Sequence, residues 1–413
     1  MLNFPGRVSA PHGFAYLFER FPSFSQTFCV REVGAMRRLG VEFPVFSIRH
    51  PTDEPPQDCG SCCEVHYLPE KSDAILSEDA GFRRAARKAQ AALKVLWGSE
   101  KEKRRVYEAL WLGPQLQAAG IRHVHAHFAG TSARTAFWLH RLFSINFSIT
   151  AHANDIFRDE PPERLAQIFD AARLVVTVSD FSVAYLREHF PASREKFQRV
   201  YNGIEMERFP LGESSPSSPL ILSVGRYIEK KGFCDLLSAC AQLANRDFVC
   251  QIIGFGPLEE DLKNQVAHLG LENKVSIAGP RSEGEIRELL SKASVFALPC
   301  VHASDGAVDN LPTVIMEAMA TGVPVVSTRV AGIPEMVLDG ETGYLVPEND
   351  PSSLAEQMRR LLDDPSTARR MGQAGRDRCS ELFDTNRTTA ALIACLQTHG
   401  ALPDGDFHSR VSG

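Results

Sequence analysis

The chain has 413 residues, of which 44% are hydrophobic and 23% charged, and its formal net charge is −6. These values are ordinary for a globular protein in water, and the length is enough for two domains. The acidic balance gives no indication of nucleic-acid binding. No apolar run approaches the length of a membrane-spanning helix, and the N-terminus lacks a signal-peptide pattern. The cysteines stand mostly in apolar contexts, which is typical of reduced, buried thiols in a cytoplasmic protein.

The chain begins with a β-α-β pattern. Apolar runs at 14–19 and 41–48 predict strands, and residues 27–39 predict a helix whose apolar positions recur at helical spacing. Such a unit implies a parallel sheet with a right-handed crossover and with helices on both of its faces.

A cysteine cluster with one histidine follows this unit: Cys59, Cys62, Cys63 and His66. The C-x2-C-C-x2-H spacing is one that can hold zinc. However, no second ligand pair follows, and the segment lies in a Pro-rich loop before a short strand. These observations favour a loop without a metal, so we predict no metal site.

Residues 82–97 predict an amphipathic helix with a basic face. Arg83, Arg84, Arg87 and Lys88 lie mostly opposite its apolar side, and no acidic residue interrupts them. Such a helix can lie on an anionic membrane surface. It can equally pack on its own sheet with its basic face in water, and the pattern does not decide between these alternatives.

Two histidines stand at the ends of successive predicted strands. His127 ends the strand 123–128, and His152 follows the strand 147–151 after an intervening helix. Ligands gather at the carboxyl ends of strands in open α/β sheets. A single histidine there is more often structural, but two in succession favour a functional His152. Asp155 is close enough in sequence to lie near the His152 imidazole.

Residues 212–219, GESSPSSP, are the clearest linker in the chain. The β-α pattern restarts after them, with a strand at 220–224 and then a loop containing Gly225, Arg226 and Lys231. Two cations at a strand-to-helix turn suit a pyrophosphate, and glycine permits close approach of a ligand to the backbone. Basic loops are nevertheless common, so these residues alone do not distinguish a pyrophosphate site from an ordinary basic loop.

Further strands are predicted at 249–253, 275–278 and 295–298. The first of them ends in a G-x-G pattern at Gly254 and Gly256. A lone G-x-G is weak evidence for a phosphate site and is also typical of an ordinary tight turn.

The segment 305–328 predicts a loop, a helix and a buried strand. Asp309 and Asn310 are good N-cap residues, and Pro312 stands where the first helical residue is expected. A helix N-terminus suits a phosphate, and carboxylates such as Asp309 and Glu317 suit sugar hydroxyls. The pattern thus indicates a site for a phosphorylated sugar or nucleotide. For either acidic residue alone, a cap or a solvated helix position is the commoner role.

This segment resembles the E-x7-E signature of retaining glycosyltransferase family 4, with Asp309 in place of the first Glu and Glu317 as the second. Asp309 is one methylene shorter than the usual residue. The sequences EAMATGVPVVST and 331–335 match the family as well, and 225–232 resembles its G-R-x4-K-G element. The opening loop and helix, RFPSFSQTFCVREVGAMRRLG, resembles that of colanic-acid-type exopolysaccharide glycosyltransferases.

The resemblance implies the GT-B fold, an α/β architecture of two Rossmann-like, doubly wound parallel-sheet domains facing across a cleft. Residues 1–211 would form the acceptor-binding domain, 212–219 the linker and 220–380 the nucleotide-sugar-binding domain. Residues 381–413 would form a C-terminal helix that crosses back to the N-terminal domain, followed by a frayed tail.

The resemblance also implies roles for individual residues. Arg226 and Lys231 would bind the nucleotide diphosphate, and Asp309 the donor sugar. Glu317 would bind the ribose, and His152 would contact the sugar near the reaction centre. The remaining donor-binding residues would be Gly225, Gly254, Gly256, Pro280, Asn310, Leu311, Pro312 and Thr313, and the acceptor would contact Ser25, Gln26, Thr27, His127 and Asp155.

The implied activity is transfer of a hexosyl group, with retention, from a UDP- or GDP-linked sugar to a lipid-linked saccharide in exopolysaccharide biosynthesis. We expect no metal or other cofactor, and a cytoplasmic enzyme that can bind the inner face of the membrane through 82–97. A nucleotide-sugar epimerase of the same fold and a non-catalytic donor-binding scaffold remain alternatives. A glycoside hydrolase would need two carboxylates flanking the bond, which the positions of Asp309 and Glu317 do not obviously provide.

Overall fold

The computed structural model describes residues 10–23, 26–51, 63–69, 87, 89, 97, 100–212, 219–405 and 407. The chain divides into two compact units. We call residues 1–178, 183–200 and 388–413 the N-terminal unit, and residues 179–182 and 201–387 the C-terminal unit. Most of the linker 212–219 and most of the basic segment 82–97 lie outside the described residues, although Arg87 and Ala89 are helical.

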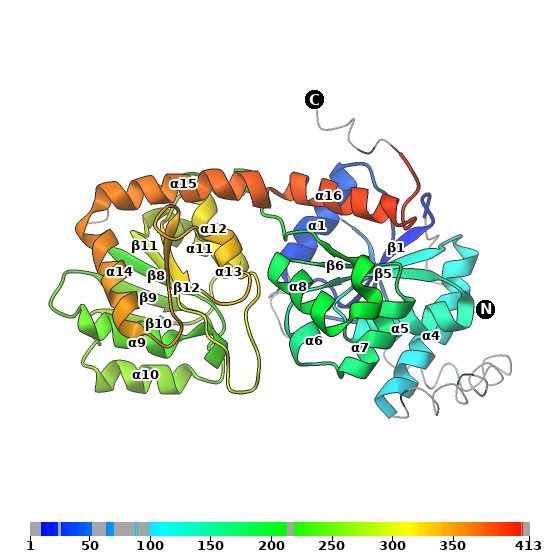
Figure 1. The fold of residues 1–413 in the computed structure, drawn as a ribbon, viewed down its shortest axis with the longest axis horizontal. Coiled ribbons are helices and arrows are strands. Elements are labelled where there is room, and N and C mark those ends of the chain that lie inside the picture. Colours follow the sequence, from blue (N-terminus) through cyan, green and yellow to red (C-terminus); the bar gives the residue numbers. More distant parts are fainter. Residues whose placement is uncertain are drawn as a thin grey trace. The chain divides into compact units, whose positions relative to one another are not determined.

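The N-terminal unit contains a seven-stranded parallel sheet with the order β3-β2-β1-β4-β5-β6-β7 (Figure 1). The order reverses between β1 and β4, the doubly wound arrangement in which a ligand crevice forms at the carboxyl ends of those strands. The strands are β1 Phe14–Arg20, β2 Val45–Arg49, β3 Val65–Tyr67, β4 His123–His127, β5 Asn146–Ala151, β6 Leu174–Thr177 and β7 Phe197–Arg199.

Helices cover both faces of this sheet. Successive residues of β1 point to opposite faces, so that Ala15 and Leu17 belong to one apolar cluster and Phe14, Tyr16 and Phe18 to the other. The first cluster is closed by α4 Glu100–Ala118, α5 Thr131–Phe143, α7 Pro162–Ala171 and α8 Asp180–His189, and the second by α1 Thr27–Arg38 and α16 Thr385–Thr398. The short elements are α6 Asn154–Phe157, η1 Pro191–Lys196 and η2 Met206–Arg208.

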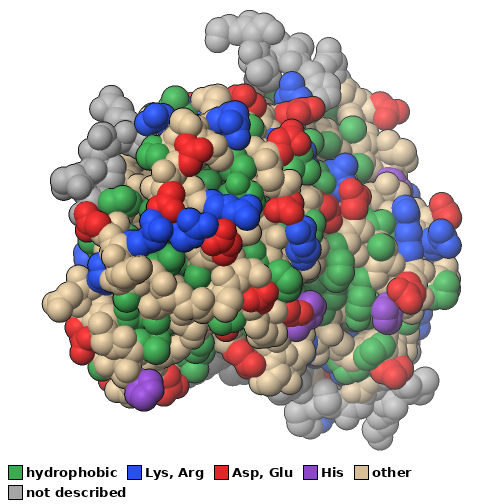
Figure 2. Space-filling view, turned by 60° about the vertical axis from the view of Figure 1, so that its left-hand side comes forward, with side chains coloured by type: hydrophobic (Ala, Val, Ile, Leu, Met, Phe, Trp, Pro, Cys, Tyr) green, Lys and Arg blue, Asp and Glu red, His purple; other side chains and the backbone are tan. Residues whose placement is uncertain are grey.

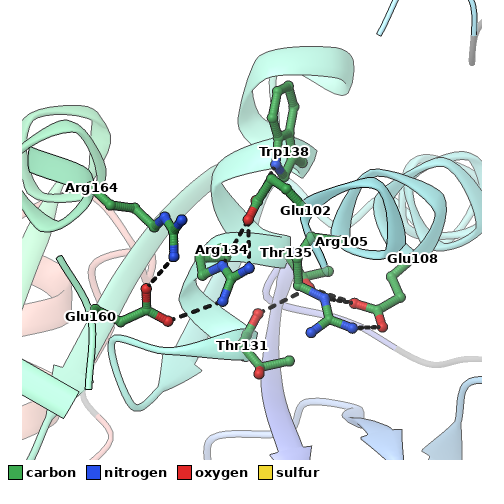
Figure 3. A network of polar contacts seen from close by, with 9 residues as sticks. All are labelled: Glu102, Arg105, Glu108, Thr131, Arg134, Thr135, Trp138, Glu160 and Arg164. Atoms are coloured by element: carbon green, nitrogen blue, oxygen red, sulfur yellow. Dashed lines mark hydrogen bonds and ion pairs between the residues drawn. The ribbon is translucent and has the colours of Figure 1, made fainter. Parts of the chain in front are cut away.

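A buried polar network joins α4 to α5 (Figure 3). Glu102 is fully buried and accepts hydrogen bonds from the Arg134 guanidinium and, at 2.8 Å, from Trp138 Nε1. Arg134 also reaches Glu160 at 3.1 Å. Each buried charge therefore has an opposite charge in contact, which is the condition under which charges are tolerated in a core.

The C-terminal unit contains a six-stranded parallel sheet with the order β10-β9-β8-β11-β12-β13. The order reverses between β8 and β11. The strands are β8 Leu220–Val224, β9 Val249–Ile253, β10 Val275–Ala278, β11 Val295–Leu298, β12 Val325–Thr328 and β13 Gly343–Val346. The helices are η3 Glu229–Lys231, α9 Phe233–Gln242, α10 Glu259–His268, α11 Glu283–Lys292, α12 Thr313–Ala320, α13 Ile333–Met336, α14 Pro351–Asp363 and α15 Pro365–Phe383.

The predicted strands are confirmed, and most of them are short apolar runs buried on both faces. Some of them are shorter than predicted: β2 begins at Val45 rather than residue 41, β4 ends at His127 rather than residue 128, and β12 begins at Val325 rather than residue 323. The fold class is confirmed as two doubly wound parallel sheets. On the face in Figure 2, acidic and basic side chains are interspersed. Within the described ranges, no helix combines the length and apolar character needed to cross a bilayer.

Candidate active site

The candidate site of the C-terminal unit lies where β8 and β11 end, at the reversal of strand order. Gly225 follows β8 directly, and Cys300 lies two residues beyond the end of β11. The loop after β8 carries the two lysines of η3, and the loop after β11 runs to α12 and carries Asp309. The sheet topology thus brings two distant sequence segments to one edge.

Gly232 allows these loops to pack against each other. Its φ is +66°, and a Cβ on this residue would lie 1.8 Å from the carbonyl oxygen of Pro299. Only glycine fits such a close approach of two backbones. The contact fixes the end of η3 against the end of β11, and so positions the lysines that precede Gly232.

Both lysines of η3 form ion pairs with one carboxylate. Lys230 Nζ lies 2.7 Å from Asp309 Oδ1, and Lys231 Nζ contacts Asp309 Oδ2. The three side chains are only 12–13% exposed. Cys300 Sγ lies 3.7 Å from Asp309 Oδ2. The cluster therefore holds two cations and one anion at a site with little access to water.

The pairing shifts the pKa values of these groups. Burial raises the pKa of Asp309, but the charges of Lys231 and Lys230 lower it by more than burial raises it. The net pKa therefore lies well below its ordinary value. Burial lowers the pKa of Lys231, but Asp309 more than reverses this, so that the net pKa is raised. Burial and the Asp309 charge raise the pKa of Cys300. At neutral pH the cluster holds two ammonium groups, a carboxylate and a neutral thiol.

The expected N-cap of the following helix is wrong. The helix α12 begins at Thr313 with Pro312 at the N-cap position, and no side chain caps it. Asp309 is held by the lysines instead, because a charge-charge contact is stronger than a cap bond. Asn310 is held by two serines, accepting from Ser179 Oγ at 2.6 Å and donating to Ser182 Oγ at 2.8 Å.

The N-terminus of α12 thus has no capping side chain, and Glu317 lies just over one turn inside the helix. Glu317 is 7% exposed, and Leu311, which precedes the helix, is also buried. Both acidic residues of the 309–317 pattern therefore lie in the same loop-helix unit as a helix N-terminus that no side chain caps. This arrangement can hold an anion and hydroxyl groups side by side.

Gly254 and Gly256 have a structural explanation. A Cβ on Gly254 would lie 1.8 Å from the carbonyl oxygen of Gly225, and one on Gly256 would lie 2.5 Å from that of Tyr227. The loops after β8 and β9 therefore pack backbone to backbone. Arg226 and Pro280 are exposed in neighbouring loops of the same sheet edge.

The N-terminal unit carries a second polar cluster, at the carboxyl ends of β4 and β5. His127 Nδ1 and His152 Nε2 are 3.4 Å apart, and both residues are buried. Asp155 accepts hydrogen bonds from the backbone N–H groups of Ala129, His152 and Ala153. Burial raises the pKa of Asp155, although these backbone bonds oppose the shift. Asp155 thus ties together the turns that follow β4 and β5.

Several residues of these clusters were not identified from the sequence. Lys230 stands beside Lys231 and gave no separate signal, and Cys300 lies in an apolar context. Glu32, whose Oε1 lies 3.0 Å from His127 Nε2, and Cys29 stand on one face of α1 three residues apart, a spacing that could have revealed a shared role.

The expected acceptor residues are described only in part. Ser25 lies outside the described residues, Gln26 is the N-cap position of α1 and Thr27 is its first residue. Of the cysteine cluster before β3, Cys59 and Cys62 also lie outside the described residues. The roles predicted for these residues remain predictions.

Comparisons with known proteins agree with this architecture. Residues 25–208 match the family model Glycosyltransferase Family 4, and residues 207–378 match the model Glycosyl transferases group 1. The two matches meet near the boundary between the units and together span most of the chain.

The chain is similar to three proteins of bacterial exopolysaccharide synthesis. It is 29% identical over 412 residues to a protein described as colanic acid biosynthesis glycosyltransferase WcaL of Salmonella typhimurium, covering 93% of this chain and 99% of that protein. The identity to the WcaL protein of Escherichia coli is 34% over 265 residues, covering 62% and 64% of the two chains. The amylovoran biosynthesis glycosyltransferase AmsK of Erwinia amylovora is 30% identical over 366 residues, covering 83% and 88%.

Solved structures share the fold at low sequence identity. A glycosyltransferase from Rickettsia africae superimposes with a TM-score of 0.71 at 16% identity, covering 94% of this chain and 98% of the other. The HepE protein of Anabaena, solved in complex with UDP, gives a TM-score of 0.67 at 16% identity, covering 93% and 100%.

The two parallel sheets with reversed strand order, together with these structural neighbours, define the GT-B fold. More narrowly, the chain belongs to glycosyltransferase family 4, the group 1 glycosyltransferases, whose members are retaining enzymes that use nucleotide sugars. The resemblance noted in the sequence is thereby confirmed.

Proposed function

We propose that this protein transfers a hexosyl group from a UDP- or GDP-linked sugar to a lipid-linked saccharide acceptor, with retention, in the synthesis of an exopolysaccharide. The observation that carries this proposal is the ion-paired cluster of Lys230, Lys231 and Asp309 at the strand-order reversal of the C-terminal sheet. Its chemistry matches the two ends of a nucleotide sugar, a diphosphate and a ring of hydroxyl groups.

The lysines are suited to the departing diphosphate. When the bond to the sugar breaks, negative charge develops on the β-phosphate, and cations fixed beforehand in a site with little water lower that barrier most. Lys231 is already fixed by Asp309 and by the Gly232 contact, so little reorganisation is needed. Arg226 and the uncapped N-terminus of α12 would add to the same charge stabilisation.

Asp309 has two tasks in this proposal. In the free protein it neutralises one of two neighbouring ammonium groups, which would otherwise repel each other. With a donor bound, the phosphates take over that neutralisation, and the carboxylate can accept hydrogen bonds from sugar hydroxyls. Glu317, on α12, would bind the ribose, and His152 of the N-terminal unit would contact the sugar near the anomeric carbon.

The proposed acceptor and pathway rest on the relatives. The names of the WcaL and AmsK proteins refer to colanic acid and amylovoran, which supports an exopolysaccharide product. A lipid-linked acceptor would place the enzyme at the inner face of the cytoplasmic membrane, where the basic segment 82–97 could bind anionic lipids.

One observation favours a second candidate, a donor-binding scaffold without transferase activity. Asp309 replaces the usual Glu of the family pattern, and both of its oxygens are engaged by lysines. If the donor cannot displace this pairing, the protein would bind the nucleotide and leave the sugar in place.

Calorimetric titration with UDP, GDP and ADP tests the donor site. We expect one nucleotide to bind the wild type, and to bind Lys231→Met more weakly. Lys263→Met is the matched control, because Lys263 is exposed and pairs only with glutamates of its own helix. If none of the three nucleotides binds the wild type, the proposal is wrong.

Incubation with the matching nucleotide sugar then tests the reaction. Transfer to a lipid-linked saccharide, with the anomeric configuration of the product unchanged by NMR, supports the transferase. A sugar altered without any acceptor would identify an epimerase instead, and nucleotide binding without either product would identify the scaffold.

A further inference from the structure

Three side chains with metal-binding atoms meet inside the N-terminal unit. Cys29 comes from α1, His127 from the end of β4 and His152 from the turn after β5. All three are buried, with exposures of 0%, 0% and 7%. Their ligand atoms all lie within 4.8 Å of one another. We propose that these three residues form a binding site for a transition-metal ion that prefers thiolate and imidazole ligands, the class to which zinc and copper belong.

The spacing of the ligand atoms fits this class of ion. Cys29 Sγ lies 3.7 Å from His127 Nδ1, and His127 Nδ1 lies 3.4 Å from His152 Nε2. With metal-nitrogen bonds of about 2.0–2.1 Å and a metal-sulfur bond of about 2.3 Å, neighbouring ligands of a tetrahedral ion lie about 3.3–3.6 Å apart. A separation of 3.4 Å is longer than the 2.7–3.2 Å range typical of protein N–H hydrogen bonds. The pair of nitrogens therefore fits a shared ion better than a shared proton.

Glu32 orients His127 for this role. Its Oε1 lies 3.0 Å from His127 Nε2 and accepts a hydrogen bond from Tyr16 at 2.5 Å. A carboxylate at Nε2 favours the tautomer with its proton on that nitrogen, which leaves the lone pair on Nδ1, toward Cys29 and His152. A carboxylate behind the histidine is the usual companion of a metal-bound imidazole.

The neighbouring His125 is less available. Its Nδ1 lies 2.7 Å from Ser148 Oγ, and its Nε2 lies 2.8 Å from Thr150 Oγ1, so both ring nitrogens are engaged by hydroxyl groups. The ligand set is therefore Cys29, His127 and His152, and a fourth position is left for a water molecule or another small ligand.

The charges of the loaded site balance. A neutral imidazole is the form that binds a metal, and both histidines of the site are buried. On binding, the Cys29 thiol loses its proton to solvent, and its thiolate joins the Glu32 carboxylate against a divalent ion. The sum is zero, which removes the main cost of burying a metal charge.

Metal loading of the full-length protein tests the site. The protein is stripped with a chelator under reducing conditions, incubated with zinc chloride and dialysed, and its zinc content is measured by elemental analysis. We expect one zinc ion per wild-type chain and none in Cys29→Ser. Cys379→Ser is the matched control, since Cys379 is also a buried helical cysteine but has no histidine partner among the described contacts.

A second arm separates this site from the cysteine cluster before β3. Cys63→Ser should retain its zinc, whereas zinc lost from Cys63→Ser and kept in Cys29→Ser would overturn the proposal. Absence of stoichiometric zinc or copper in the loaded wild type would overturn it as well. Cys29→Val is included in case the serine variant fails to fold, because an apolar side chain of similar size keeps the core packed.

Spectroscopy identifies the ligands and the ion. Cobalt in place of zinc should give an absorption band from a thiolate ligand in the wild type and in Cys379→Ser, but not in Cys29→Ser. Glu32→Gln should weaken zinc binding about 10- to 100-fold, as the loss of a partner behind a metal-bound histidine does. Competition between zinc and copper ions decides which member of the class binds more tightly. The result does not depend on the proposed transferase activity.

Discussion

The two sheets carry different kinds of side chain at their carboxyl edges. Each sheet reverses its strand order once, between β1 and β4 in the N-terminal unit and between β8 and β11 in the C-terminal unit. In the C-terminal unit the side chains gathered there are Lys230, Lys231 and Asp309. In the N-terminal unit the imidazoles and the thiol come from the end of β4, the turn after β5 and the helix α1. The topology determines where a ligand can bind, and the side chains determine which kind of ligand it is.

The surroundings of His152 and Lys231 explain why the pKa values of these two basic side chains move in opposite directions. His127 lies against aromatic rings, with centroids 5.3 Å from Tyr16 and 4.8 Å from Phe18. The neighbouring His152 has a lowered pKa because burial disfavours its charged form. Lys231 is buried too, but its carboxylate partner outweighs the burial and raises its pKa. Burial thus favours neutral groups unless an opposite charge is in contact.

The largest expected effect comes from removing the Lys231 charge. Lys231→Met should lower the rate of sugar transfer about 100- to 1,000-fold, the usual result of removing one group that stabilises charge in a transition state. The measurement is kcat with saturating donor and acceptor. A rate as high as that of the exposed control Lys263→Met would show that the charged sheet edge is not the reaction site.

A smaller effect is expected on stability when Asp309 is replaced. Asp309→Asn leaves two neighbouring ammonium groups without their carboxylate, and should lower the free energy of unfolding by about 1–3 kcal/mol at neutral pH. Because the folded-state pKa of Asp309 is held below its usual value, its contribution is complete above about pH 4 and is lost as the pH falls further.

Urea unfolding of the wild type and Asp309→Asn, from neutral pH to below about pH 4, measures the difference between their free energies of unfolding. It should be constant near neutrality and shrink below about pH 4. Asp309→Glu, which restores the usual residue of the family, should keep most of the stability. A difference between wild type and Asp309→Asn that does not vary with pH would contradict the assigned ion pairs.

The smallest effect on the transfer rate is expected from replacing His152 in the N-terminal unit. His152→Gln should lower the transfer rate about 2- to 10-fold, the value of one hydrogen bond, and leave nucleotide binding unchanged. The experiment is done in the presence of a chelator, so that metal binding does not contribute. The exposed His189→Gln serves as control. Weakened nucleotide binding in His152→Gln would contradict the proposal that the C-terminal unit binds the nucleotide and that His152 contacts only the sugar.

The sequence was sufficient for the strands that it predicted and for the helices α1 and α12, because buried parallel strands are short apolar runs and these two helices have clear helical patterns. The helices α4 and α10 were not predicted. The sequence was less informative about residues whose partners are distant. Lys231 and Asp309 were each identified, but not their ion pair, because the strand order brings them together. For the same reason Asp309 was predicted as a helix cap.

Cys29 shows the same limit. It was not singled out in the sequence, and its neighbours His127 and His152 come from the end of β4 and the turn after β5, much later in the chain. No short sequence pattern shows that these three residues lie close together in the fold. The motif of family 4, in contrast, is local, and this is why it could be identified from residues alone.

The close contact at Gly232 has a consequence for directed evolution of this enzyme. A side chain there would collide with the backbone at Pro299 before it could reach any substrate. Libraries that vary this position would therefore consist mainly of unfolded variants, whichever sugar is selected for. Diversity is better placed at Asp309 and in the loop leading to Thr313, where changes alter side chains at the proposed donor site and leave the contact between Gly232 and Pro299 in place.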